Sequence, residues 1–424
     1  MIEEVKVVSH RFDIPNSHIL DTILSYGAYR VLPIGLSMKK DSIMDMIVQS
    51  GLRGKGGGGA LAGEKWLLMP TDSIKPSYLV VNCDESEPGT FKDRQIITKD
   101  PHLLIEGIIL TSYAISANAA YIYIRGEYQD FEAILQKAID DAYEKGYLGD
   151  NIIGKNFNLD ITIHRGAGAY ICGEKSALLE SLEGKRGHPR LKPKEKEPEW
   201  YFGNPTLVNN VETITSVPFI IENRAAAYRR FGTEHSSGSM LFALSGHVEK
   251  AGIHEVAFGT PMLEFINQFG GGIKDGKRLK AVIPGGSSTP ILTADEVAIA
   301  TLDYETLRSL GSSLGTGGMI VMDEDTDMVE ALKNLLEFYH EESCGQCTPC
   351  REGTGLSDTL LKKILTGKGT SSDIDKLLDL ADIMNGKTIC VFAPAVSGVI
   401  QSFISKFRNE FEGKVERKGG VDGY

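Results

Sequence analysis

Apolar residues in the first half of the chain recur in short blocks that polar and glycine-rich segments separate. Blocks of strand length occupy residues 78–81, 121–124 and 159–163. Apolar residues with helical spacing occupy residues 41–49, 103–117, 131–143 and 174–182. Strands that alternate with helices are typical of βαβ units. This half of the chain is therefore predicted to form an α/β layer with a mostly parallel sheet.

The pattern changes near residue 240. From there on, short apolar runs at 241–244 and 279–283 alternate with glycine-rich turns around one helical segment at 261–269. This predicts a small α+β insert of ubiquitin size. From residue 328 on, four stretches keep helical spacing and glycines separate them, which predicts a terminal bundle of four helices.

Composition narrows the function classes. A length of 424 residues suggests two or three domains. The formal charge is −12, whereas nucleic-acid binding needs a basic face, so a nucleic-acid-binding protein is not expected. The most apolar stretch, residues 103–115, is interrupted by Glu106 and is too short to span a bilayer. The start of the chain shows no secretory signal. We therefore expect a cytoplasmic protein that reaches a membrane only through partners.

A glycine-rich loop follows the first helical stretch. Residues 51–59 hold six glycines, which allow the backbone to lie against a flat or phosphorylated ligand with its N–H groups pointing inward. Lys55 in this loop and Lys65 beyond it could neutralise a phosphate. The match to the G-x-G-x-x-G pattern is weak because a helix precedes it, so a mobile surface loop is the alternative.

Two further loops carry polar side chains at the ends of predicted strands. Residues 82–89 hold three carboxylates within four positions, which is costly unless they face donors such as a flavin edge or ribose hydroxyls. A solvated acidic turn would explain the same residues. Asn209 and Asn210 place two amides at another turn, where they would bind a ligand or cap the following helix.

The cysteines carry the most specific chemistry. Cys344, Cys347 and Cys350 have two residues between successive thiols, and Cys390 follows after two helical stretches. Three closely spaced thiolates and one distant one predict a [4Fe–4S] cluster. A zinc site with four cysteines, which usually pairs two CxxC knuckles, is one alternative, and unrelated thiols are another. The two isolated cysteines at positions 83 and 172 are interpreted as small buried residues.

Five motifs together resemble the flavoprotein subunits of NADH–quinone oxidoreductase, the respiratory complex I, a family with relatives in diaphorase and hydrogenase subunits. They are residues 51–57, 84–94, 165–174, 208–213 and 342–351, in the family's order and spacing. The resemblance implies a Rossmann-like FMN-binding domain, a ubiquitin-like SLBB (β-grasp) insert and a four-helix bundle that carries the cluster. We place these domains at residues 1–235, 236–322 and 323–412, followed by a flexible tail at 413–424.

The resemblance also implies an activity and a set of site residues. In the family, hydride passes from NADH to FMN, which carries the chemistry, and single electrons leave through the [4Fe–4S] cluster. The matching FMN positions are Gly54, Lys55, Gly56, Lys65, Asn82, Asp84, Gly173, Glu174, Asn209, Asn210 and Thr213. The matching nucleotide positions are Glu85, Glu87, Tyr170, Lys175 and Lys192. The implied partners are a thioredoxin-like [2Fe–2S] subunit and a larger Fe–S subunit, since this chain encodes no second cluster motif.

The sequence departs from the family where the adenosine half of the nucleotide should bind. Residues 60–62 read Ala-Leu-Ala instead of Phe-Pro-Thr, and Leu68 and Glu195 stand where two further aromatics would stack on the adenine. Losing one aromatic platform costs about 1 kcal/mol or more. Lys175 replaces a carboxylate that helps to reject a 2′-phosphate, and two lysines beside Glu195 add positive charge.

Three functions therefore stay open. The chain is a nucleotide-oxidising subunit that uses NADH or NADPH, or an electron-transfer subunit whose flavin takes electrons from a protein donor such as a ferredoxin or flavodoxin. The third is a structural remnant, and the intact cysteine motif argues against it.

Overall fold

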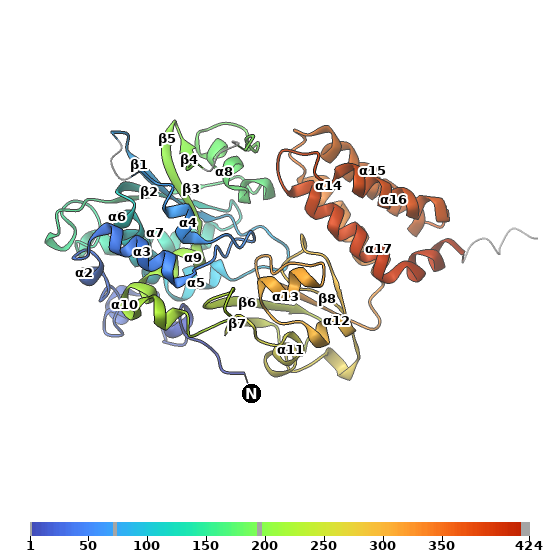
Figure 1. Cartoon of the computed structure of the whole chain (residues 1–424), viewed down its shortest axis with the longest axis horizontal. Helices are drawn as coiled ribbons and strands as arrows, with labels where there is room; N and C mark the ends of the chain where they lie inside the picture. The colour runs from blue at the N-terminus through green and yellow to red at the C-terminus, as the bar shows by residue number, and fades with distance from the viewer. Residues whose placement is uncertain (1, 71–73, 193–196, 417–424) are drawn as a thin grey trace, which may run out of the picture.

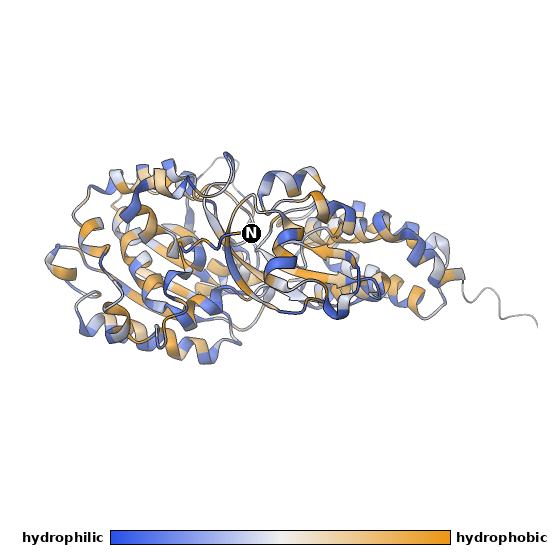
Figure 2. Ribbon diagram, turned by 90° about the horizontal axis from the view of Figure 1, so that it is seen from below, coloured by the Kyte–Doolittle hydropathy of each residue, from blue (hydrophilic) through white to orange (hydrophobic). Residues whose placement is uncertain are grey.

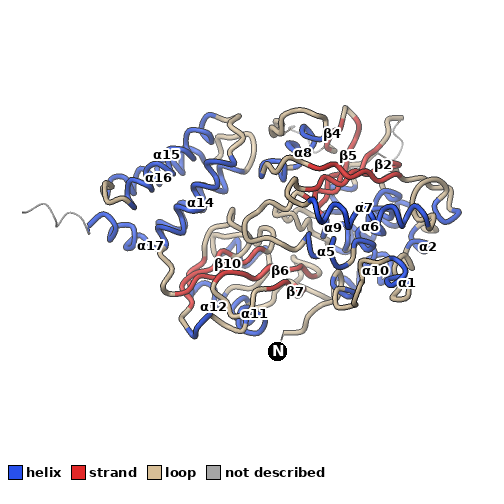
Figure 3. Tube along the Cα trace, turned by 180° about the vertical axis from the view of Figure 1, so that it is seen from behind, coloured by secondary structure: helices blue, strands red, loops and turns tan. Residues whose placement is uncertain are grey.

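The computed structural model describes residues 2–70, 74–192 and 197–416 of the chain. Within these ranges the chain forms two five-stranded sheets and a terminal helical bundle (Figure 1). Apolar residues concentrate on the strands and on the inner sides of the helices (Figure 2). Seen from behind, the two sheets are separate groups of strands, and the bundle lies to one side of both (Figure 3).

The first sheet is the predicted α/β layer, with strand order β3-β2-β1-β5-β4. Its strands are β1 (Ser77–Cys83), β2 (Ala117–Ile124), β3 (Asp160–Arg165), β4 (Glu199–Tyr201) and β5 (Asn204–Asn210). All neighbours pair in parallel except β4 with β5. The central strand β1 is almost continuously apolar because helices cover a parallel sheet on its faces. Its end pairs Asn82 with Asn210 of β5, which brings two polar turns to one edge of the sheet.

This layer also contains helices, among which α6 is buried along almost its whole length. They are η1 (Ser9–Arg11), α1 (Leu20–Leu24), α2 (Leu32–Gly35), α3 (Lys40–Ser50), α4 (Ala62–Trp66), α5 (Asp93–Lys99), α6 (Pro101–Ala114), α7 (Gln129–Glu144), η2 (Ile152–Gly154), η3 (Tyr170–Gly173), α8 (Lys175–Leu182), α9 (Val211–Thr215) and α10 (Val217–Tyr228). The helix predicted for residues 103–117 ends early, at Ala114. Ser116 adopts a left-handed φ of 60°, and β2 begins at Ala117.

Glu106 explains how the N-terminal segment, which the pattern left unassigned, folds onto α6. Its carboxylate is buried and accepts backbone N–H bonds from Tyr29, Val31 and Leu32 at 3.0–3.1 Å. A buried carboxylate needs such donors, and here they come from a turn that contains no regular strand. Burial raises the pKa of Glu106 to about 7.

The second sheet forms the insert, with strand order β7-β6-β10-β8-β9. Its elements are β6 (Ser239–Gly246), β7 (Gly252–Ala257), α11 (Met262–Gly270), η4 (Lys274–Gly276), β8 (Leu279–Ile283), β9 (Leu292–Thr293), α12 (Ala294–Ile299), α13 (Tyr304–Ser309) and β10 (Gly318–Asp323). The runs predicted at 241–244 and 279–283 are confirmed as parts of β6 and β8. The central strand β10 escaped prediction, although it pairs with both of them.

The bundle consists of α14 (Met328–Glu342), α15 (Thr348–Leu365), α16 (Ser371–Met384) and α17 (Phe392–Glu416). Each of these helices contributes to one apolar core. The prediction of a flexible tail is wrong for residues 413–416, because α17 continues to Glu416 and buries Phe411; residues 417–424 lie outside the described residues. None of the helices in the described ranges combines the length and apolar content that a membrane crossing requires.

Candidate functional site

A cavity of about 570 Å³ opens where the α/β layer, the insert and the bundle meet. This volume is typical of small-molecule sites. The layer contributes the glycine loop at residues 55–58, the acidic loop after β1 and the turn at η3. The insert contributes residues 288–290 and 312–316 except 314, and the bundle contributes the start of α17. All three parts of the fold therefore build one cleft.

The edge of the first sheet forms one wall of this cleft. The Asn82 amide donates to the carbonyl oxygen of Gly173 at 2.9 Å and accepts from the N–H of Asp84 at 3.0 Å. Asp84 is buried beside it, and burial raises the pKa of its carboxyl to about 7, although Arg125 opposes this shift. The acidic loop is therefore an ordered wall, and the alternative of a solvated turn is wrong.

Glycines leave the backbone of the other wall open to the cavity. A Cβ at Gly56 would meet the Asn210 Cβ at 3.1 Å, whereas a Cβ at Gly58 would meet open space. Gly57 has a φ of 109°, which side chains rarely adopt. Such a wall suits a flat or phosphorylated ligand, because N–H groups approach it without intervening side chains.

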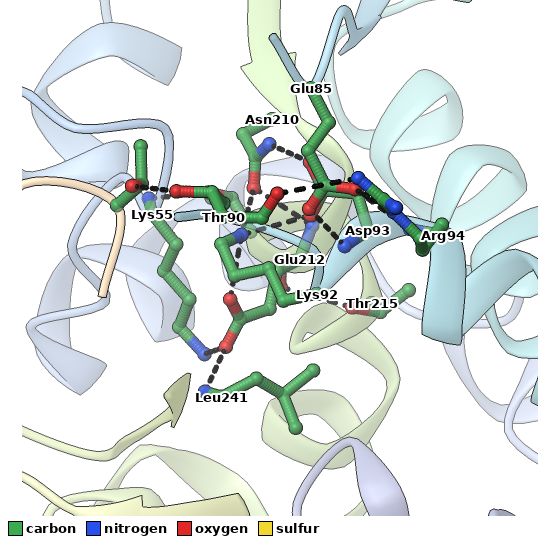
Figure 4. Close-up of polar contacts among 12 residues, drawn as sticks. Lys55, Glu85, Thr90, Lys92, Asp93, Arg94, Asn210, Glu212, Thr215 and Leu241 are labelled. Atoms are coloured by element: carbon green, nitrogen blue, oxygen red, sulfur yellow. Dashed lines mark hydrogen bonds and ion pairs between the residues drawn. The ribbon is translucent and has the colours of Figure 1, made fainter. Parts of the chain in front are cut away.

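The lysines expected at a phosphate have other partners. Lys55 lines the cleft, but its side chain is fully buried and its Nζ donates to Ser216 Oγ at 2.9 Å. The same Nζ lies 3.3 Å from an oxygen of Glu212 (Figure 4). Lys65 lies outside the lining and donates to the carbonyl oxygen of Val208 at 2.6 Å. Burial lowers the pKa of Lys65 to about 8. The interpretation that both ammonium groups neutralise a phosphate is therefore wrong for Lys55, and the described cleft lining does not include Lys65.

The predicted FMN positions divide into two groups. Those that line the cleft are Lys55, Gly56, Asn82, Asp84, Gly173, Glu174 and Asn210. Those behind the lining are Gly54, Lys65, Asn209 and Thr213. Asn210 also caps α9 by accepting from the N–H of Glu212 at 3.0 Å, so the helix-cap interpretation of this amide is confirmed, and its contact with a ligand stays a prediction. The Nδ2 of Asn209 is buried and has no hydrogen-bond partner among the described residues.

The predicted nucleotide carboxylates are tied to the protein. Glu85 accepts from the N–H of Asp93 at 2.7 Å and from the Tyr128 hydroxyl at 2.8 Å. Glu87 accepts from the Tyr170 hydroxyl at 2.6 Å and from an N–H of the insert at 2.7 Å. Burial raises the pKa of Glu87. Glu85, Glu87 and Tyr170 all line the cleft, but their side chains hold its walls together.

The remaining nucleotide positions lie outside the cleft lining. Lys175 forms an ion pair with Glu199, and Lys192 is exposed. Ala60 and Leu68 do not line the cleft either, and Glu195 with its two neighbouring lysines lies outside the described residues. The positive charge of Lys175 is therefore largely compensated.

Sequence reasoning missed Lys92, whose side chain lines the cleft and is only 1% exposed. Its ammonium bonds to Asp93 at 2.9 Å and forms an ion pair with Glu212 at 2.8 Å. The sequence offered one hint of this role, because Lys92 stands directly before Asp93 in a motif rich in carboxylates. The counter-charge of Glu212, far along the chain on α9, was not visible.

The four predicted ligand cysteines lie together at a second, smaller cavity next to the cleft. Cys344, Cys347, Cys350 and Cys390 all line it, and all four are free thiols. The N–H of Ile389 donates to the Cys347 Sγ at 3.3 Å. Soft thiolates spread around a shared cavity suit a multi-iron cluster.

Comparisons with known proteins bear on both cavities. Residues 47–219 match the model of the Nuo51 FMN-binding domain, residues 240–329 the SLBB domain, and residues 330–414 the NADH-ubiquinone oxidoreductase-F iron-sulfur binding region. The chain is 48% identical over 401 residues to the NADH-quinone oxidoreductase F subunit of Rickettsia bellii (strain OSU 85-389), covering 94% of this chain and 96% of that relative. This chain belongs to the family of NADH-quinone oxidoreductase F subunits.

Other relatives agree with this assignment. The NADH-quinone oxidoreductase F 2 subunit of Rhizobium meliloti (strain 1021) is 43% identical over 413 residues, which cover 97% of this chain and 98% of the relative. A solved structure of an NAD+-reducing [NiFe]-hydrogenase in the air-oxidized state has a TM-score of 0.83 and 34% identity, over 94% of this chain and 68% of that one. The expected FMN-binding α/β domain, SLBB insert and [4Fe–4S] region of an F subunit are confirmed.

The buried Asp84 predicts a pH effect on stability. Asp84→Asn should raise the free energy of unfolding of the flavin-free protein at pH 8, on the order of 4 kcal/mol. The folded pKa of about 7 exceeds the unfolded value of 3.8, so stability from this group is complete below pH 3.8 and is lost as the pH rises through 7. Urea unfolding at pH 4, 6 and 8 measures it.

The advantage of the asparagine should therefore shrink toward pH 4. Asp379→Asn, at an exposed position on α16, serves as the control, and its effect should stay constant over this range. A gain from Asp84→Asn that is the same at pH 4 and pH 8 would contradict the assignment of a buried, neutral carboxyl.

Proposed function

We propose that this chain accepts hydride from a nicotinamide dinucleotide at FMN bound in the cleft and passes single electrons to a [4Fe–4S] cluster held by Cys344, Cys347, Cys350 and Cys390. The observation that carries this proposal is that Cys390 lines both cavities, so the two cofactor sites adjoin. FMN, when bound, supplies the conversion between two-electron and one-electron chemistry. The acceptor toward which the relatives' name points is a quinone.

The protein's own contribution is binding and orientation. We propose that the backbone at residues 55–58 and the side chains of Asn82, Asp84 and Asn210 bind FMN, with Gly173 and Glu174 closing the cleft. Gly54, Lys65, Asn209 and Thr213 support these residues from behind. Thr213 does so directly, since its Oγ1 accepts from the N–H of Lys55 at 2.9 Å. In the same way, Glu85, Glu87 and Tyr170 shape the nucleotide entrance, while the two carboxylates keep their hydrogen bonds to the protein.

The second candidate is a subunit whose flavin takes electrons from a protein donor. The lost aromatics at positions 60 and 68 and the internal bonds of Glu85 and Glu87 favour it. Anaerobic titration of the flavin-loaded protein with NADH and then NADPH decides between the candidates, because bleaching of the flavin absorbance reports reduction. Bleaching by a reduced ferredoxin and by neither nucleotide would overturn the first proposal.

Lys175→Glu should shift the NADPH-to-NADH ratio of flavin reduction rates toward NADH. A charge reversal near a phosphate is worth roughly 1–3 kcal/mol. Glu199 already compensates Lys175, and the lysine is 44% exposed, so we expect about 1 kcal/mol, or roughly fivefold. Lys137→Glu on α7 changes an exposed, paired lysine elsewhere and should leave the ratio unchanged. Rapid reduction of the wild type by NADH alone, with an unchanged mutant, contradicts this role.

We further propose that the chain works as one subunit of a larger assembly, beside a thioredoxin-like [2Fe–2S] subunit and a larger Fe–S subunit. Electrons that reach the cluster need an acceptor, and the chain's sequence contains a single cluster motif. The assembly would hold it at the cytoplasmic face of the membrane through partners. Isolation from the native source as a lone, fully active monomer would contradict this. The domain division at residues 235, 322 and 412 stays part of the proposal.

A further inference from the structure

A group of buried polar and charged side chains forms part of the cleft wall, and Figure 4 shows how they lie. We call it the buried charge network and define it as Lys55, Lys92, Asp93, Asn210 and Glu212. Its centre is Glu212, in the first turn of α9, whose side chain is fully buried and does not line the cleft. In the proposed function, the Glu212 carboxylate does not contact a cofactor.

The Glu212 carboxylate joins three separate segments of the fold. One oxygen lies 3.3 Å from Lys55 Nζ and accepts from the N–H of Leu241 in β6 at 2.8 Å. The other oxygen lies 2.8 Å from Lys92 Nζ. The glycine loop, the start of α5 and the first strand of the insert therefore meet at one side chain.

Both lysines held by Glu212 contribute directly to the cleft. Lys55 lines it next to Gly56, and Lys92 lines it beside Asp93. The ammonium of Lys92 also donates to Asn210 Oδ1 at 3.2 Å, and the Asn210 amide donates to Asp93 Oδ2 at 2.7 Å. Any movement of Glu212 would therefore displace two parts of the cleft wall.

The charges of the network balance, with two ammonium groups against two carboxylates. Burial would raise the pKa of Glu212, but the ammonium groups of Lys92 and Lys55 outweigh it and hold the pKa below its ordinary value. Neutralising Glu212 would leave two buried ammonium groups facing one carboxylate. The excess positive charge would lie at the wall of the cleft, where it would favour added electrons on any bound redox group.

We propose that Glu212 is a positioning residue for the flavin cleft, which fixes the glycine loop and Lys92 against the insert and sets the charge behind the bound flavin. This inference rests on the proposed binding of FMN in the cleft. A buried carboxylate with a purely structural role offers a contrast. Glu106 is equally buried, but its partners are backbone N–H groups that do not reach the cleft.

The test measures the dissociation constant of FMN by fluorescence titration and the midpoint potential of the bound FMN. Glu212→Gln should weaken FMN binding at least tenfold and shift the potential upward. Glu212→Asp keeps the charge and should restore most of the FMN affinity and most of the wild-type midpoint potential. Glu106→Gln, the matched control, should lower the melting temperature while leaving the dissociation constant within twofold of wild type.

A charge-balanced double variant keeps the test decisive if Glu212→Gln fails to fold. Lys55→Met combined with Glu212→Gln removes one charge of each sign and should still weaken FMN binding at least fivefold. A dissociation constant within twofold of wild type for folded Glu212→Gln, alone or combined with Lys55→Met, would overturn the inference. Wild-type protein that binds no FMN at all would instead overturn the proposed function.

Discussion

Cys347→Ala should abolish the reducible [4Fe–4S] signal in electron paramagnetic resonance while FMN stays bound. Cys347 lines the cluster cavity but not the flavin cleft, so its loss removes one of four thiolate ligands and leaves the cleft walls in place. A cubane held by three cysteines lacks a protein ligand at one iron, and we expect no intact cluster. Iron content and the spectrum of the dithionite-reduced protein provide the measurement.

Cys172→Ala is the matched control for this variant. Cys172 is also a free thiol, and it is buried outside the cluster cavity. Its substitution should leave the iron content and the signal unchanged. Wild-type protein that carries zinc and no iron would show that the cysteines form a different site.

Gly56→Trp should eliminate bound FMN. Even a Cβ at this position comes within 3.1 Å of the Asn210 Cβ, and an indole ring would fill the cleft between the glycine loop and the end of β5. The backbone N–H groups of the loop would also lose their approach to the ligand. Flavin released by heating the purified protein, identified by chromatography, gives the readout.

A tryptophan elsewhere separates this effect from general damage. Gly413 lies on α17, and a Cβ there meets no atom within 4 Å. Gly413→Trp should therefore retain its flavin. Stoichiometric FMN in Gly56→Trp would contradict the assignment of the cleft as the flavin site.

The alternation of strand-like and helix-like apolar blocks in the sequence predicted most of the fold. Apolar blocks are local signals, so β1 and α7 follow from the residues inside them. Helix α6 shows the limit, because an apolar run continues beyond Ala114 and only the left-handed turn at Ser116 ends the helix. Strand β10 depends on pairing with β6 and β8, far away in the sequence, and a local pattern cannot reveal such pairing.

In the candidate site, too, features that depend on neighbouring residues were predicted, and features that depend on distant partners were not. The cysteine spacing predicted four residues that do lie together at one cavity, because three of them are near neighbours in the chain. The role of Lys55 was misjudged, since a lysine side chain is long enough for its backbone to face one cavity while its ammonium reaches a carboxylate on the other side. Which direction it takes depends on Glu212, and that partner becomes apparent only when the chain is folded.

The wall that Cys390 contributes to both cavities has a thermodynamic consequence. Binding sites that share a structural element are coupled, and the coupling is reciprocal. If assembly of the metal centre tightens the grip on flavin by some factor, bound flavin must stabilise the occupied metal centre by the same free energy. The total free energy of binding both prosthetic groups is then the same whichever of them enters the chain first during maturation.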